Sequence, residues 1–309
     1  MDALSEVLRL ARFTAGVTLD ATAHAPWCVS VPSSPSMARA HVILDGECML
    51  KAASGEEAVL KAGEIAILAH GDAHLIGSSV EHDARPLSAL LKAPVAGELL
   101  PVSFGESGPV TRWIVISISC ERHFAEPLLG ALPPVTHVEL NGAAALYWFT
   151  DALGLTLSAS AAPPIGAAAE RARLAELVVI EAFSRHVYGL PVGGEGWLAG
   201  LSDRFVGRAL ALVHGRPSEP WTVERLGRHV GLSRSALAER FSQVMGEPIF
   251  TFLTRWRLQV AAEYLLTTAR PVESIAHEAG YESASAFSVA FKRVFGRPPS
   301  AWRKKPRRK

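Results

Sequence analysis

Two segments near the C-terminus, residues 223–248 and 272–298, each carry polar side chains at helical spacing. An arginine can donate two hydrogen bonds to guanine and a glutamate can accept one from cytosine, whereas lysine and arginine also pair with phosphates. We therefore treat the outward positions of both segments, most of them polar, as candidate contacts to DNA. They are Arg234, Ser235, Glu239 and Arg240 in the first segment, and Ser285, Ser288, Val289, Lys292 and Arg293 in the second.

The two segments are copies of one another. Val223 recurs 49 positions later as Val272, and Phe241 recurs 50 positions later as Phe291. In each copy a glycine, the residue that takes a left-handed conformation without a steric penalty, ends a short helix, and a serine then caps a second helix. This layout predicts a helix-turn-helix. Ordinary helical hairpins are the alternative, but the duplication, the matching turns and the basic charge favour a DNA-binding domain.

Each copy separates a buried helix face from an open one. Leu237 and Phe241 are predicted to pack on the first helix, which Thr222 caps, and Phe287 and Phe291 take the same places in the second copy. The open face of the second copy holds fewer long hydrogen-bond donors. We therefore expect the first copy to read bases and the two cations of the second to hold phosphates.

The near-neutral total of +1 conceals two halves of opposite charge. Residues 201–309 contain 19 Lys and Arg against 9 Asp and Glu, whereas residues 1–200 contain 12 against 21. A basic half joined to an acidic half indicates one module for nucleic acid and another for a different task. The three cysteines predict no disulfide framework, and neither a signal peptide nor a membrane-length apolar run is expected. These features predict a soluble, cytoplasmic protein with double-stranded DNA as a partner and no membrane association.

The N-terminal half has the pattern of a small β-structure. Short apolar runs in residues 26–91 are separated by turn signals such as Asp45-Gly46. Such spacing is typical of a β-barrel or sandwich. The expected strands are residues 41–44, 48–52, 64–68 and 113–118.

Residues 143–188 change to Ala- and Leu-rich sequence with helical spacing. The apolar face around Leu174, Leu177 and Val178 is wider than one contact between a helix and a sheet requires. Two interpretations remain open, a core helix against the β-structure and a helix that forms a homodimer, and both can hold at once.

The chain is predicted to be α+β, a β-rich barrel with flanking helices followed by an all-α domain of two helix-turn-helix units joined by a long helix. That long helix covers residues 249–268, with Phe252, Leu253, Trp256, Val260 and Leu265 buried by pattern. A Pro- and Gly-rich stretch marks the boundary. We place the barrel and its helices in 1–195, a linker in 196–202, the DNA-binding domain in 203–302 and a basic tail in 303–309.

The C-terminal domain resembles the AraC/XylS family of bacterial transcription regulators over residues 203–302. The matching stretches are LGRHVGLSRSALAERF, TRWRLQVAAEYL and IAHEAGYESASAFSVAFKRVFGRPPSAWR. The resemblance implies two helix-turn-helix units in successive major grooves, and an activator of transcription with RNA polymerase as a partner. Members of the family often have Arg or Lys at the position of Val289, so the second unit departs from the pattern there.

HVILDGECML and GEIAILAHGDAH resemble the cupin-type sensor domain of a subgroup of that family. The second stretch implies turns at Gly63 and Gly71 and a histidine, His74, at a metal-ligand position. The chain departs from the cupin pattern at Ala69, where proline is usual, and at Arg39, which stands about where a carboxylate ligand falls. We therefore expect no metal or cofactor. Because the inward positions of the β-structure carry few charges, we expect a sensor that takes a small, largely apolar effector or responds to a partner.

Three classes of function follow from these patterns. The preferred one is a DNA-binding regulator with a cupin-like sensor, in which His41 and His74 are candidate effector contacts or, equally, packed core histidines. The second is a cupin-type metal-dependent enzyme with a helical appendage, its site assembled from His41, His70, His74 and Cys28 or Cys120. The third, a pure interaction module, is disfavoured by the basic faces. Because no serine–histidine–aspartate motif or phosphate-binding glycine loop is present, we expect no catalysis.

Overall fold

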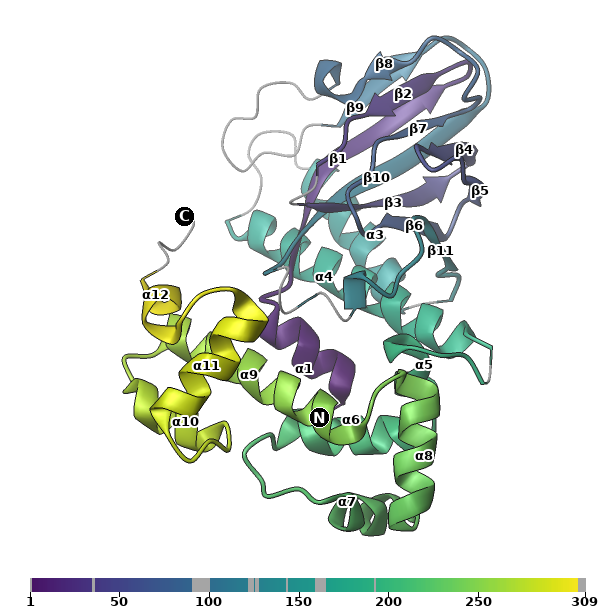
Figure 1. The fold of residues 1–309 in the computed structure, drawn as a ribbon. Coiled ribbons are helices and arrows are strands. Elements are labelled where there is room, and N and C mark those ends of the chain that lie inside the picture. Colours follow the sequence, from purple (N-terminus) through teal and green to yellow (C-terminus); the bar gives the residue numbers. More distant parts are fainter. Residues whose placement is uncertain are drawn as a thin grey trace. The chain divides into compact units, whose positions relative to one another are not determined.

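The computed structural model describes residues 2–34, 37–90, 101–121, 125, 128–142, 144–158, 165–191 and 193–304. The chain divides into a β-rich unit, Arg12–Gly189, and a helical unit built from both ends of the chain, Met1–Ala11 and Leu190–Lys309 (Figure 1). We call them the β unit and the helical unit. The predicted α+β class is confirmed. No helix among the described residues is long and apolar enough to cross a membrane.

Within the described residues the strands of the β unit form two sheets. The larger sheet has the order β11 (Thr136–Glu139), β6 (Glu64–Leu68), β3 (Ala38–Asp45), β10 (Val110–Ser119), β1 (Thr14–His24) and β9 (Val102–Gly105). The smaller sheet has the order β5 (Glu57–Lys61), β4 (Glu47–Ala52), β7 (His74–Gly77), β2 (Cys28–Val31) and β8 (Arg85–Pro86). Ile43 and Trp113 from the larger sheet and Leu50 and Ile76 from the smaller share one apolar core. The four expected strands are confirmed as β3, β4, β6 and β10.

The sequence pattern did not reveal β1, β9 or β11. β1 reads TAGVTLDATAH, in which alanine, glycine and aspartate have low strand propensity. Hydrogen bonds to two neighbouring strands hold this segment as a strand despite its low propensity. β1 is antiparallel to β10 on one side and parallel to β9 on the other. Ala21 and Ala23 are completely buried by this pairing.

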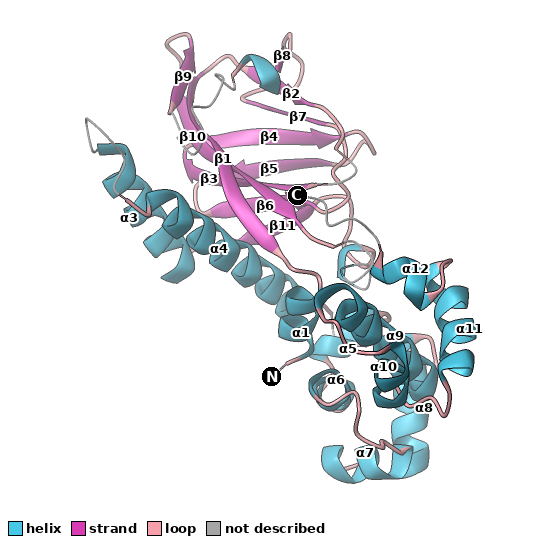
Figure 2. Cartoon of the chain, turned by 90° about the vertical axis from the view of Figure 1, so that its left-hand side faces the viewer, coloured by secondary structure: helices cyan, strands magenta, loops and turns pink. Residues whose placement is uncertain are grey.

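Two helices, α3 (Ala144–Ser158) and α4 (Ala167–Gly189), lie side by side along the larger sheet (Figure 2). α4 buries Val178, Val179 and Phe183 and packs against β1 and β11. The prediction of a core helix is therefore confirmed for this face of α4. Leu177, on another face, remains 45% exposed, so the dimer interpretation stays a prediction. Residue 143 lies outside the described residues.

The C-terminal part of the helical unit follows the predicted tandem arrangement. Its helices are α5 (Trp197–Ser202), α6 (Val206–Gly215), α7 (Val223–Val230), α8 (Arg234–Met245), α9 (Ile249–Thr267), α10 (Val272–Glu278), α11 (Ala284–Phe295) and α12 (Pro299–Arg303). The long helix α9 joins the pair α7–α8 to the pair α10–α11. Each of its five predicted core residues, from Phe252 to Leu265, is buried.

The predicted turns and caps are confirmed in both copies. Thr222 accepts a backbone N–H at the start of α7, and Ser233 and Ser283 do so at the starts of α8 and α11. Gly231 and Gly280 have φ of +87° and +83°, which is the left-handed region that a side chain disfavours. The turns therefore hold α8 and α11 at defined angles to the helices that precede them.

The two units begin and end elsewhere than the sequence indicated. Helix α1 (Ala3–Leu10), placed by the sequence in the region 1–195, packs on α6 and buries Val7 and Leu10. The expected linker 196–202 is instead helix α5, which packs on α6 and α8 because the side chains of Trp197 and Leu198 are buried there. Of the tail 303–309, residues 305–309 lie outside the described residues.

Candidate functional site

Helix α8 presents the polar face that the sequence predicted. Arg234, Ser235 and Glu239 are all exposed, while Leu237 and Phe241 on the opposite face are completely buried. Arg234 lies 3.4 Å from Glu224 of α7, a loose and exposed pair that leaves the guanidinium available to another acceptor. The base-reading candidates thus lie together on one accessible face.

Arg240 has a partner inside the protein. Its guanidinium forms a two-pronged ion pair with Asp203, with Nη2 at 2.7 Å and Nε at 3.0 Å from Oδ2. Asp203 also accepts the backbone N–H groups of Phe205 and Val206 at the start of α6. These hydrogen bonds and the nearby arginine offset the desolvation that burial imposes and hold the pKa of the Asp203 carboxyl below its usual range. Because the two residues are 37 positions apart, no local pattern reveals this pairing.

Helix α11 presents a different chemistry. Ser285, Val289, Lys292 and Arg293 are exposed, and the Val289 side chain is 71% exposed. Ser288 is half-buried and its hydroxyl donates to the carbonyl of Ala284 at 2.7 Å, within the helix. The donors that remain on this face are mainly the two cations. Beyond the helix, Arg297 is a further exposed cation that the sequence pattern did not single out.

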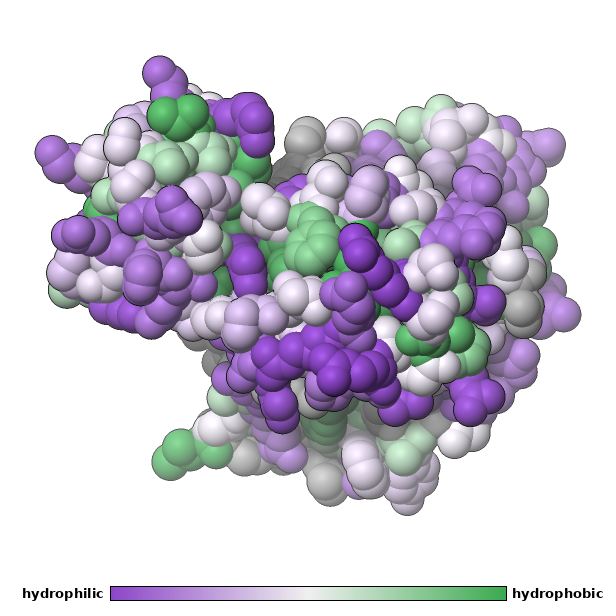
Figure 3. Space-filling view, turned by 60° about the horizontal axis from the view of Figure 1, so that its bottom comes forward, coloured by the Kyte–Doolittle hydropathy of each residue, from purple (hydrophilic) through white to green (hydrophobic). Residues whose placement is uncertain are grey.

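Both recognition helices are anchored on α9. Phe241 of α8 contacts Phe252 of α9 edge to face, with 5.8 Å between the ring centroids. Phe291 of α11 contacts Trp302, whose indole N–H donates to the carbonyl of Ala262 in α9. In the space-filling view, hydrophilic side chains cover much of the face of the helical unit that comes forward (Figure 3). The apolar face of α9 therefore joins α8 and α11, each of which has an exposed polar face.

In the β unit, the structure brings His41 and His74 together. His41 on β3 and His74 on β7 reach across from the two sheets, and their Nε2 atoms are 2.7 Å apart. His74 Nδ1 lies 2.9 Å from the carbonyl of Asp72, so this nitrogen is the donor. With His74 neutral, its Nε2 therefore accepts a hydrogen bond from Nε2–H of His41. His41 Nδ1 has no partner among the described residues.

Burial keeps both imidazoles uncharged. Desolvation lowers the pKa of His74 to about 4, partly opposed by the hydrogen bond to Asp72. Desolvation also holds the pKa of His41 well below its usual value, and the neighbouring His74 and Arg39 add to this effect. At neutral pH the pair is therefore a neutral bridge between the two sheets.

The residues that the cupin fold would offer to a metal ion do not fit one here. Two nitrogens bound to tetrahedral Zn²⁺ lie roughly 3.3 Å apart, further than the two hydrogen-bonded imidazoles of this pair. No group of three or more His, Cys, Asp or Glu side chains with metal-site geometry occurs in the part of the chain that the structure describes. His70, the other candidate histidine, contacts the carbonyl of Leu132 at 3.2 Å.

A cavity of about 690 Å³ opens beside His74 in the β unit. It lies at the ends of β2, β4 and β7, next to β8 and the short 3-10 helix Leu87–Ala89. The lining is largely apolar, with Val31, Ala52 and Leu75 among its members, and Lys51 adds a cation. His41 does not line this cavity, because it lies behind His74 and is completely buried. Of the two predicted effector contacts, only His74 reaches the cavity.

Comparison with known proteins agrees with both halves of this description. A cupin family model matches residues 2–187, and a helix-turn-helix domain model matches residues 226–305. An AraC-like transcription regulator of Streptomyces antibioticus is 32% identical, with 99% of each chain covered. One of Streptomyces lividans is also 32% identical over 99% of each chain, and the transcriptional regulator AlkR of Acinetobacter baylyi is 26% identical, with 98% of this chain and 99% of AlkR covered.

These relatives are transcription regulators and not enzymes, as the sequence predicted for this chain. The match extends over both units, and it agrees with the tandem serine-capped helices and with the two sheets. The chain belongs to the AraC family of DNA-binding transcription regulators, with an N-terminal cupin domain and a C-terminal helix-turn-helix domain.

Proposed function

We propose that this regulator reads DNA through two successive major grooves and activates transcription in response to a small molecule bound by the β unit. The observation that carries the proposal is the pair of serine-capped helices α8 and α11, each with an exposed polar face and each packed on α9. A helix capped in this way presents its first turns to a groove. α9 buries its apolar face along the helix and so joins the two pairs.

The two helices divide the work by their chemistry. Arg234 and Glu239 of α8 supply long, exposed groups that match guanine and cytosine edges. Lys292 and Arg293 of α11 hold phosphates, which position the protein without reading sequence. Val289 offers the bases only an apolar contact, such as one to a thymine methyl group.

Binding measurements on full-length variants test this division. Arg234→Ala or Glu239→Ala should relax sequence preference, at about 1–3 kcal/mol for a lost base contact. Lys292→Ala or Arg293→Ala should weaken binding to all duplexes alike and lower the salt slope by about 1. Arg240→Ala is the matched control on α8, since Asp203 already engages that guanidinium. Altered base preference from the α11 variants, with none from the α8 variants, would refute the assignment.

The cavity beside His74 is the proposed effector site. Its volume is within the range of sites for small molecules, and its largely apolar lining with a few polar groups favours a mostly apolar ligand. His74 supplies a polar group at the wall, and His41 holds that imidazole in place from behind through the 2.7 Å contact.

The effector site is tested by reporter transcription with a panel of small apolar compounds. His74→Ala and His41→Ala should each change the transcriptional response to the compound that induces the wild type. The first removes a polar group from the cavity wall, and the second removes the contact that holds His74 in place. The exposed His82→Ala variant is the control. If both cavity variants remain folded and respond like the wild type, the cavity is not the effector site.

We infer that the regulator is a homodimer joined through α4. Leu177 and Tyr188 on this helix are 45% and 85% exposed, although α4 already packs on the sheet with another face. Exposed apolar side chains of this size favour a protein contact. Leu177→Glu should lower the sedimentation coefficient of the full chain at micromolar concentration, whereas Val59→Glu, at another exposed apolar position on β5, should not. A wild-type chain that sediments as a monomer contradicts this inference.

Activation further requires contact with RNA polymerase, the remaining proposed partner. Transcription from a template that carries a selected site should increase when the purified regulator and its inducer are added. A decrease under the same conditions identifies a repressor instead.

A further inference from the structure

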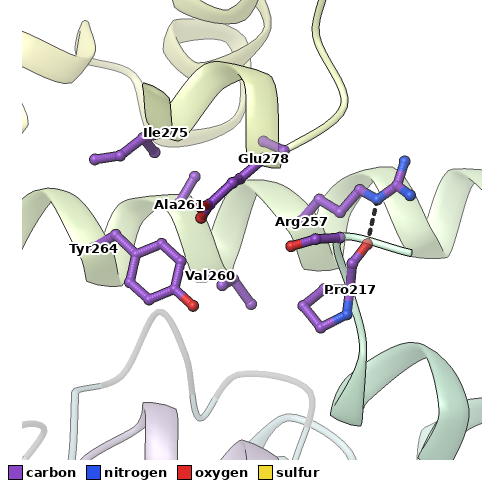
Figure 4. Close-up of a pocket in the computed structure, with 9 residues that line it drawn as sticks. Pro217, Arg257, Val260, Ala261, Tyr264, Ile275 and Glu278 are labelled. Atoms are coloured by element: carbon purple, nitrogen blue, oxygen red, sulfur yellow. Dashed lines mark hydrogen bonds between the residues drawn. The ribbon is translucent and has the colours of Figure 1, made fainter. Parts of the chain in front are cut away.

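Arg257 lies on α9, midway between the two helix-turn-helix units, and its guanidinium contacts both. Its Nε donates to the carbonyl of Pro217 at 2.7 Å, and its Nη2 donates to the carbonyl of Glu219 at 2.8 Å. Figure 4 shows Arg257 beside a small pocket, with Pro217 on one side and Glu278 of α10 on the other. The side chain is half-buried, and burial lowers its pKa, although an arginine stays charged.

The loop that Arg257 contacts leads directly into the first unit. The indole N–H of Trp221 donates to the carbonyl of Arg216 at 2.8 Å and closes the loop on itself. Arg225 of α7 forms an ion pair with Glu219 at 2.7 Å and stacks over Trp221. Because the loop is tied to α7 in this way, its position sets the position of α7, and α8 follows.

On its other side Arg257 meets the turn of the second unit. A Cβ added to Gly280 would lie 2.9 Å from Nη1 of Arg257, so the guanidinium packs against the bare backbone of this turn. The next residue, Tyr281, contacts Phe287 of α11 at 5.6 Å between ring centroids. The equivalent glycine of the first unit, Gly231, has no such neighbour within 4 Å among the described residues. The second turn is therefore adapted to this arginine.

We propose that Arg257 is a positioning residue that fixes the distance between α8 and α11, and so restricts the regulator to DNA sites with one spacing between the two half-contacts. The inference rests on the proposed contact with two grooves. α9 anchors each unit through apolar packing, which lets a helix pair tilt with little loss of contact. Two charge-assisted hydrogen bonds to fixed carbonyls are directional and oppose such a tilt.

The test is selection of bound duplexes from a randomised library by the full-length wild type, Arg257→Ala and Arg255→Ala. Arg255 is the matched control because it lies two positions from Arg257 on the same helix. It pairs with Glu247, and not with the loop before α7 or the turn at Gly280. Wild type and Arg255→Ala should enrich sites with one spacing. Arg257→Ala should enrich sites with several spacings. A one-base-pair insertion between the half-contacts should cost the wild type more than about tenfold in affinity, and Arg257→Ala less than about threefold.

Each result has one interpretation. If Arg257→Ala enriches the same single spacing and keeps the wild-type penalty for the insertion, the proposal is wrong. If Arg257→Ala fails to fold by circular dichroism, Arg257→Lys, which keeps the charge but not both hydrogen bonds, decides by the same measurements. A wild type whose selected sites contain one half-contact overturns the two-groove function itself, and with it this role of Arg257.

Discussion

Acidification should weaken the β unit through its buried histidine pair. Burial lowers the pKa of His74 from its usual value of 6.5 to about 4, and the pKa of His41 is lowered as well. In the unfolded chain both imidazoles are hydrated and take up protons near their usual pKa. Between these limits the unfolded state binds more protons than the folded state, so the free energy of unfolding decreases as the pH falls.

The size of the effect follows from the two pKa values of His74. Linkage gives a loss of about 2 kcal/mol between about pH 7.5 and about pH 5 from this residue alone. His41 adds to the loss with the same sign. Carboxyl groups contribute less in this window because their usual pKa values, near 4, lie below it.

Urea titrations of the full chain at the two pH values, with hydrogen exchange of the β3 and β7 amides followed by mass spectrometry, measure the β unit alone. His74→Gln should reduce the pH-dependent loss by about 2 kcal/mol, whereas the exposed His82→Gln should leave it unchanged. A wild-type β unit that is equally stable at both pH values would show that the pair is not held neutral. Equal losses in the wild type and in His74→Gln would assign the effect to other groups.

Three further changes test the packing of the helical unit. Asp203→Ala should cost about 1–2 kcal/mol in a urea titration followed by circular dichroism, because Asp203 caps α6 and pairs with Arg240; an unchanged midpoint contradicts both roles. Phe291→Ala should cost about 3–5 kcal/mol by calorimetry, since the ring is completely buried, and a loss below 1 kcal/mol would mean that the site is not packed as described. Val7→Ala should cost about 1–2 kcal/mol and increase hydrogen exchange in α6 but not in the β unit, and the reverse pattern would place α1 elsewhere.

The helix-turn-helix units were predictable because their determinants are local. Glycine at a left-handed turn, serine at the next cap and phenylalanine four residues after an inward leucine or phenylalanine all act within one copy. The duplication then provided a second, independent reading of the same pattern. The same helical spacing predicts which residues of α8 and α11 face outward. It does not predict what those residues contact.

The features that sequence could not provide depend on contacts between distant positions. β1 is a strand because of its neighbours, and the pairing of Arg240 with Asp203 joins residues from different helices. His41 and His74 were each singled out, but their direct contact depends on the approach of two sheets. The cavity likewise arises from the ends of three strands, so periodicity along any one of them does not locate it.

The membership of α1 in the helical unit decides how DNA binding should be measured. A fragment that begins at residue 190 lacks α1, and so exposes the surface of α6 that covers Val7 and Leu10 in the whole chain. His214 of α6 lies beside the backbone of Ala3, and burial lowers its pKa to about 3. Without α1 that imidazole loses a neighbour that helps to bury it, and we expect its pKa to move back toward the usual value. Such a fragment is therefore less stable than the same helices in the intact protein, and a weaker affinity measured with it does not report on α8 and α11.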